Sequence, residues 1–72
     1  MPIHVNSLEE LGRIIQKRRK SLKITQQELS SLCNLSVVGI SKIERGKSDL
    51  RFSTLKRLGD ILGIQVVLEL EE

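Results

Sequence analysis

The side chains that could act on a phosphate or a base gather in the middle of the chain. All 12 lysines and arginines lie within residues 11–57 beside three acidic residues, which gives this stretch a charge of +9. Residues 1–10 carry −2 and residues 58–72 carry −4, so the net charge is +3. A basic stripe on a small domain favours nucleic-acid binding, because neutralised phosphates release counterions. The alternative is a solvated helix face.

Aromatic content bears on the kind of nucleic acid. Phe52 is the single aromatic residue of the chain. Proteins that hold single strands stack the splayed bases on several aromatic side chains, and this sequence offers no such platform. The composition therefore favours a duplex as the partner.

Few residues suit catalysis or metal binding. Cys33 is the only cysteine and His4 the only histidine, so neither an internal disulfide nor a zinc site is expected. Nucleophile triads, paired catalytic carboxylates and phosphate-binding glycine loops all need partners that the chain lacks, so we expect no enzyme and no cofactor. Cys33 is expected to be a buried, unreactive thiol, and His4 receives no role. Short apolar runs and an N-terminus without a signal sequence predict a cytoplasmic protein.

Four helices are predicted to position the basic residues within one domain, residues 1–72. Ser7 with Glu10 and Thr25 with Glu28 have the spacing of capping boxes, in which two side chains satisfy free backbone N–H groups. Asn34 tolerates the left-handed conformation that ends many helices. The predicted helices cover about residues 8–21, 26–33, 37–45 and 54–62, with N-caps at Ser7, Thr25, Ser36 and Ser53, and with Gly46 and Gly63 after the last two.

The end of the chain changes to a two-residue period, which predicts a β-strand over about residues 64–70. A single apolar strand exposes its edge, and the chain offers only Ile3-His4-Val5 as a weak internal partner. We therefore expect pairing with the same strand of a second copy about a twofold axis. The alternative is a frayed or packed extended tail. The predicted dimer contacts are Ile64, Val66, Val67, Leu68 and Leu70.

The helices at 26–33 and 37–45 are joined by a few residues, which is the spacing of a helix-turn-helix motif. In that motif the first helix supports the second, which lies in the major groove. The apolar residues placed to bury the inner faces are Leu29, Cys33, Leu35, Ile40 and Ile43.

Two sequence elements strengthen this interpretation. TQQEL at 25–29 and ISKIERG at 40–46 closely resemble the Cro/C1-type (XRE) helix-turn-helix family of phage and bacterial repressors, over about residues 11–63. Ser30 stands where the family prefers Ala, and Asn34 where it prefers Gly. Both residues are small enough to keep the turn between the helices. The resemblance implies a mainly α, lambda-repressor-like domain.

The resemblance also implies roles in DNA binding. Gln26 would contact a phosphate at a helix N-terminus, and Ser36 would both cap its helix and touch the DNA. Val37 and Val38 would meet thymine methyl groups, although Val38 is expected to be partly buried. Ser41 and Lys42 would read polar base edges. The full implied set is Gln26, Ser36, Val37, Val38, Ser41 and Lys42, with Arg45, Lys47, Lys17 and Arg18 at the backbone and Arg51 in the minor groove.

One further pair in the family is structural. Arg19 matches an arginine of the first helix, and Glu44 matches the glutamate near the end of the recognition helix. The resemblance implies a partly buried ion pair between them, which would support the fold without contacting DNA.

The four helices followed by a strand look like the HipB-like antitoxins, whose dimer holds a HipA-type serine/threonine kinase toxin. This similarity implies a homodimer that reads a palindromic operator, autoregulates its operon and binds such a kinase. Two alternatives remain open. The first is a stand-alone repressor with the same chemistry, and the second is a protein-interaction module without DNA readout.

Overall fold

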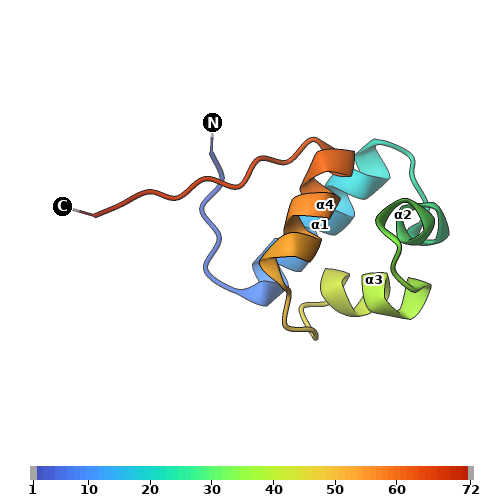
Figure 1. Ribbon diagram of the computed structural model, residues 1–72. Helices are drawn as coiled ribbons and strands as arrows, with labels where there is room; N and C mark the ends of the chain where they lie inside the picture. The colour runs from blue at the N-terminus through green and yellow to red at the C-terminus, as the bar shows by residue number, and fades with distance from the viewer. Residues whose placement is uncertain (1, 72) are drawn as a thin grey trace.

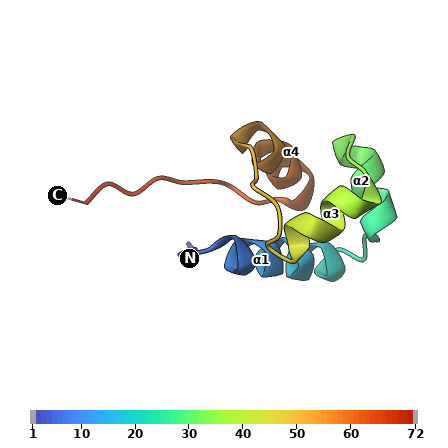
Figure 2. The same ribbon diagram turned by 90° about the horizontal axis from the view of Figure 1, so that it is seen from below.

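The computed structural model describes residues 2–71 and has four helices: α1 (Leu8–Ser21), α2 (Gln26–Cys33), α3 (Val37–Glu44) and α4 (Phe52–Leu62). α1 packs against α3 and α4, and α2 packs against the same two helices. The two terminal segments leave the helices on the side away from α2 (Figures 1 and 2). None of the described helices is both long enough and apolar enough to cross a membrane.

Local hydrogen bonds explain where the first two helices begin. The Thr25 hydroxyl accepts from the backbone N–H of Glu28 at 3.0 Å, and the Glu28 carboxylate accepts from the N–H of Thr25 at 2.9 Å. These hydrogen bonds from Thr25 lower the pKa of Glu28. Ser7 likewise accepts from Glu10 at 3.1 Å, but the Glu10 carboxylate accepts from the N–H of Asn6. The capping box of Thr25 and Glu28 is therefore complete. At the start of α1, the Glu10 carboxylate accepts from Asn6, one residue before the N-cap Ser7.

Three residues with positive φ terminate helices or turns. Asn34 ends α2 with φ 57°, and Gly63 ends α4 with φ 71°. α3 ends at Glu44, one residue earlier than predicted, with Arg45 as its C-cap. Gly46 follows with φ 70° and turns the chain away from the helix.

The start of α4 differs from the prediction. The N-cap is Arg51, not Ser53, and the helix begins at Phe52. The physical reason is that the Arg51 carbonyl already accepts the N–H of Leu55 at 3.0 Å, which closes the first turn two residues early. The Arg51 side chain makes no capping hydrogen bond, so backbone geometry alone sets this boundary.

The core lies where all four helices meet, and α1 approaches α3 with no space between their backbones. An added Cβ at Gly12 would lie 2.6 Å from the Glu44 carbonyl oxygen. Glycine at this position therefore lets α3 rest directly on α1. The fully buried apolar side chains are Ile15, Leu29, Cys33, Ile40, Leu58 and Leu62.

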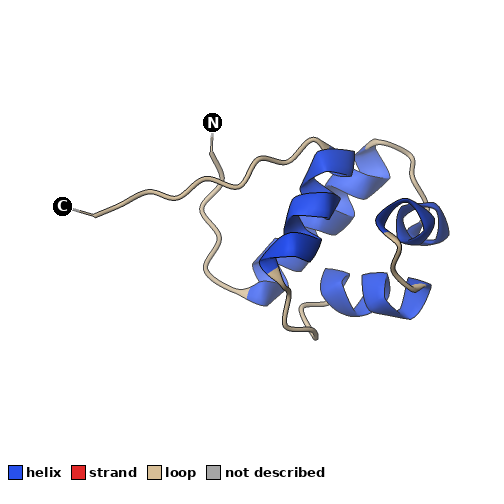
Figure 3. Ribbon diagram, in the orientation of Figure 1, coloured by secondary structure: helices blue, strands red, loops and turns tan. Residues whose placement is uncertain are grey.

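The predicted strand is not formed within the chain. Residues 2–71 contain no strand (Figure 3), and residues 64–71 run as an extended segment that gives the molecule its longest dimension, 42 Å. Ile64 packs on the core, whereas Leu68 and Leu70 are each 89% exposed. The reason is that a strand needs a hydrogen-bonded neighbour, and the weak partner proposed at residues 3–5 forms no ladder with it.

Candidate nucleic-acid interface

The outer face of α3 presents a mixed apolar and polar surface. Ile40, Ile43 and Glu44 are buried against the other helices. The opposite side exposes Val37 at 41% and Val38 at 63%. The expectation that Val38 would be partly buried is wrong, because the buried side of α3 runs through positions 40, 43 and 44. Ser41 is half-buried, and the remaining residues on the outer side, Lys42 and Arg45, are exposed.

The side chain of Ser36 fixes the start of α3. The Ser36 hydroxyl accepts from the N–H of Gly39 at 2.9 Å, as an N-cap does. The turn before it is held by the N–H of Leu35, which donates to the Ser30 carbonyl at 2.9 Å. Ser30 is buried, and its hydroxyl donates to the Gln27 carbonyl at 2.7 Å. This bond explains how serine is accommodated where the family prefers alanine.

A buried ion pair anchors the other end of α3. Arg19 Nε lies 2.6 Å from Glu44 Oε2, and the same guanidinium donates to Glu44 Oε1 at 3.1 Å. Arg19 also donates to the carbonyl of Ile24 at 2.8 Å. Both side chains are almost fully buried, so these bonds fix the relative position of α1 and α3.

The Glu44 carboxylate remains charged in this environment. Burial favours the neutral acid, but the hydrogen bonds from Arg19 and Gln26 and the charge of Arg19 outweigh it, so the pKa of Glu44 is lowered. The carboxylate therefore keeps its negative charge against the guanidinium at neutral pH.

Gln26 lies close to this pair. Its side-chain amide donates to Glu44 Oε1 at 3.0 Å, which ties the start of α2 to the end of α3. The amide thus supports the fold in the free protein, and the predicted phosphate contact of Gln26 stays a prediction. Its backbone N–H lies in the first turn of α2, where helix N–H groups favour anions.

Two predicted backbone contacts and the predicted minor-groove arginine lie beyond the end of α3. Arg45, Lys47 and Arg51 are exposed, and Arg45 Nε donates to the Ser41 carbonyl at 3.3 Å. Arg51 also lines a shallow groove between α3 and α4 together with Arg57. The sequence alone does not indicate a role for Arg57, because its place on α4 beside α3 depends on tertiary packing.

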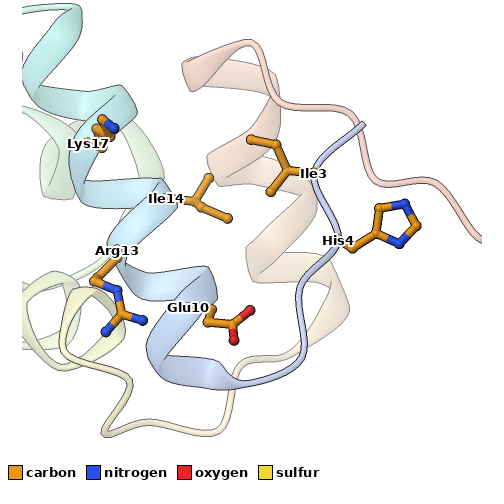
Figure 4. A pocket seen from close by; sticks show the side chains of 6 residues that line it. All are labelled: Ile3, His4, Glu10, Arg13, Ile14 and Lys17. Atoms are coloured by element: carbon orange, nitrogen blue, oxygen red, sulfur yellow. The ribbon is translucent and has the colours of Figure 1, made fainter. Parts of the chain in front are cut away.

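The structure does not bring Lys17 and Arg18 together with α3. Lys17 lines a pocket with five residues of α1 and the N-terminal segment (Figure 4): Ile3, His4, Glu10, Arg13 and Ile14. Arg18 Nε donates to the Leu62 carbonyl at 2.6 Å and so connects α1 to the end of α4. Arg18 therefore has an observed structural contact, and its predicted contact with the DNA backbone, like that of Lys17, stays a prediction.

Across residues 2–71, no three His, Cys, Asp or Glu side chains converge as metal ligands would. Cys33 is buried and free, and desolvation raises the pKa of its thiol although the charge of Arg57 opposes the shift.

Comparison with known proteins agrees with this geometry. A family model described as helix-turn-helix matches residues 15–68. This chain belongs to the helix-turn-helix family of the Cro/C1 (XRE) type. The chain is 39% identical over 56 residues to the immunity repressor protein of Bacillus phage phi105. That match covers 78% of this chain but only 39% of the phage protein.

Solved structures share the fold. The restriction-modification controller protein C.AhdI from Aeromonas hydrophila superimposes with a TM-score of 0.77 at 22% identity, covering 81% of this chain and 88% of that chain. A chain of the HipA-HipB-O2-O3 complex superimposes with a TM-score of 0.81 at 18% identity, covering 99% of this chain and 100% of that chain. The second match therefore includes the extended C-terminal segment.

Proposed function

We propose that this chain is a sequence-specific, double-strand DNA-binding transcriptional repressor that places α3 in the major groove. The observation that carries the proposal is the outer face of α3, which is exposed while its inner face is fixed by core packing and by the Arg19–Glu44 pair. An α-helix fits the major groove of B-DNA, and a rigid support fixes which side chains meet the bases. We assign the chain no catalytic activity.

The side chains on this face divide into two roles. Val37 and Val38 supply apolar contact to thymine methyl groups, and Ser41 with Lys42 supplies polar contact to base edges. Lysine reaches guanine O6 and N7, whereas serine bonds either kind of base. The predicted backbone contacts, which carry affinity without sequence information, are Gln26, Ser36, Arg45, Lys47, Lys17 and Arg18. Arg51 would lie in the minor groove.

The test begins with selection of a binding site from a random duplex library. Fluorescence anisotropy then gives Kd for the selected site and for a scrambled duplex. We expect Lys42→Ala to lose about 1–3 kcal/mol of discrimination between the two. Lys56→Ala is the matched control, because Lys56 is an exposed α4 lysine paired at 3.5 Å with Asp60, and it should leave discrimination unchanged.

Two results would contradict the proposal. Discrimination unchanged in Lys42→Ala and in the double variant with Ser41→Ala would remove α3 from base recognition. A flat dependence of Kd on salt would argue against phosphate contacts and favour the protein-interaction module.

We further propose a homodimer, formed by antiparallel pairing of residues 64–70 from two copies. The support is the exposed apolar series in an extended segment, with Val66 at 44% and Val67 at 70% exposure. Two recognition helices related by a twofold axis would read a palindrome with half-sites about 34 Å apart, or a multiple of it. Sedimentation equilibrium should show a dimer, and removal of residues 65–72, which keeps Ile64 on the core, should leave a folded monomer.

We also propose that this DNA-binding protein binds a HipA-like kinase and is the antitoxin of that kinase. The supporting observation is the match to the HipA-HipB-O2-O3 complex along 99% of this chain, C-terminal segment included. Affinity capture from the native host under nuclease and high salt, followed by mass spectrometry, tests it. A near-stoichiometric kinase supports the antitoxin, whereas recovery of the homodimer alone favours a stand-alone repressor.

A further inference from the structure

The first turn of α3 differs in chemistry from the turn that follows it. Val37 and Val38 are 41% and 63% exposed, and Gly39 has no side chain. The Ser36 hydroxyl oxygen already accepts the N–H of Gly39 at 2.9 Å. Residues 37–39 therefore present no side-chain group that donates or accepts a hydrogen bond. Their outer surface consists of valine methyl groups.

The polar side chains of the outer face lie one turn farther along the helix. Residues four apart are neighbours on a helix surface, so Ser41 follows Val37 and Lys42 follows Val38. One helical turn rises about 5.4 Å, and successive base pairs are about 3.4 Å apart. In the major groove, the bases that face the two valines are therefore about one or two base pairs from those that face Ser41 and Lys42.

A valine side chain can distinguish bases in the major groove by their methyl groups. Thymine displays a C5 methyl group and the O4 acceptor, whereas cytosine displays the N4 donor. Valine packs against the methyl group but forms no hydrogen bond with O4 or N4. Methylation of cytosine at C5 places a methyl group at the same position of the pyrimidine ring. For valine, 5-methylcytosine therefore offers the same contact as thymine.

We propose that the first turn of α3 recognises the C5-methyl group of a pyrimidine, so that the protein accepts 5-methylcytosine in place of thymine; this inference rests on the proposed function. Val38 is the main contact, because it exposes more of its surface than Val37. Unmodified cytosine and uracil lack the methyl group and bind more weakly at that position. Binding to a site with cytosine there consequently depends on C5 methylation of the DNA.

Duplexes that lack single methyl groups test this proposal. The site selected from the random library is remade with deoxyuridine at each thymine in turn, and fluorescence anisotropy gives Kd. Loss of one buried methyl group should raise Kd about fourfold. We expect this rise at one or two thymines of a half-site, within about two base pairs of the position at which Lys42→Ala loses discrimination.

At those positions the thymine–adenine pair is then replaced by cytosine–guanine, with and without the C5 methyl group. Unmethylated cytosine should raise Kd about fourfold or more, and 5-methylcytosine should return Kd to within about twofold of the original value. If 5-methylcytosine does not restore binding, a hydrogen-bonding group reads O4 or N4 at that position, and the proposal is overturned.

Valine variants assign the contact to α3. Val37 and Val38 are exposed, so the double alanine variant should keep its fold, which circular dichroism checks. In this variant, deoxyuridine should change Kd less than about twofold. Val5→Ala is the matched control, because Val5 in the N-terminal segment is 40% exposed, and it should keep the fourfold effect. A methyl effect that persists in the double variant would contradict the role of the two valines.

Failure of this inference is distinguishable from failure of the proposed function. Equal Kd values for the selected and the scrambled duplex would overturn sequence-specific DNA binding, and the inference with it. A selected site that is bound tightly but is insensitive to deoxyuridine at every thymine it contains would leave the repressor intact and would overturn methyl recognition alone.

Discussion

Replacement of Glu44 by alanine tests how the recognition helix is held. The substitution removes three hydrogen bonds, two from Arg19 and one from Gln26, and leaves the Arg19 guanidinium buried without its counterion. Loss of one partner from a buried pair costs about 3–5 kcal/mol. Arg19 keeps the Ile24 carbonyl at 2.8 Å, so the lower end of that range applies.

Opposing effects reduce the cost but do not cancel it. Alanine is a better helix former than glutamate, and a negative charge at the C-terminal end of α3 opposes the helix dipole, which together return about 1 kcal/mol. The net loss is then about 2–3 kcal/mol. A chain of 72 residues has a free energy of unfolding of about 4–11 kcal/mol, so the loss is a large fraction of it.

Thermal and urea unfolding, followed by circular dichroism at 222 nm, measure this loss. A change of 2–3 kcal/mol corresponds to a fall in Tm of roughly 10–20 °C for a domain of this size. Asp60→Ala is the control, because its pair with Lys56 is exposed and should contribute less than about 0.5 kcal/mol. A fall in Tm as small in Glu44→Ala as in Asp60→Ala would refute the reasoning.

Three other outcomes follow from the same structure. The folded-state pKa of Glu44 is lowered, so the stability that its carboxylate contributes is present above the unfolded pKa of about 4.3 and is lost as pH falls through the folded value. Urea unfolding should therefore show a smaller destabilisation by Glu44→Gln at pH 3 than at pH 6. Gly12→Ala should destabilise by about 1–3 kcal/mol despite better helix propensity, because its Cβ would meet the α3 backbone; unchanged urea midpoints would contradict the close approach. Cys33 should react with a thiol reagent far more slowly in native protein than in urea, and equal rates would contradict its burial.

The helices and their caps were predictable because their signals are local. Thr25 with Glu28 and the left-handed Asn34 each depend on a few neighbouring residues, and both are found in the structure. Ser53 had the same kind of signal, yet α4 begins two residues earlier, since the Arg51 carbonyl is already engaged by Leu55. A cap signal identifies a helix, whereas tertiary placement of its apolar face decides where the first turn closes.

In the candidate site, too, local features are predictable from the sequence, whereas features set by tertiary packing are not. The exposure of Lys42 follows from the helical period, but the greater exposure of Val38 over Val37 depends on how far α3 is rotated against α1 and α2. Arg18 and Lys17 are both basic and adjacent in sequence, so the sequence alone does not distinguish their roles. Neighbouring helix positions point about 100° apart, so one meets the end of α4 and the other the N-terminal segment.

Buried charge serves here to orient α3. Packing of Ile40 and Ile43 against the core is non-directional and tolerates small rotations of the helix. The Glu44 carboxylate, by contrast, accepts from Arg19 on α1 and from Gln26 on α2, and hydrogen bonds to charged groups weaken steeply away from their preferred geometry. An apolar replacement of the pair would match its stability, since buried ion pairs pay a large desolvation cost, but would not restrict rotation in the same way. The pair is therefore better understood as fixing the direction in which the outer face of α3 points than as a source of stability.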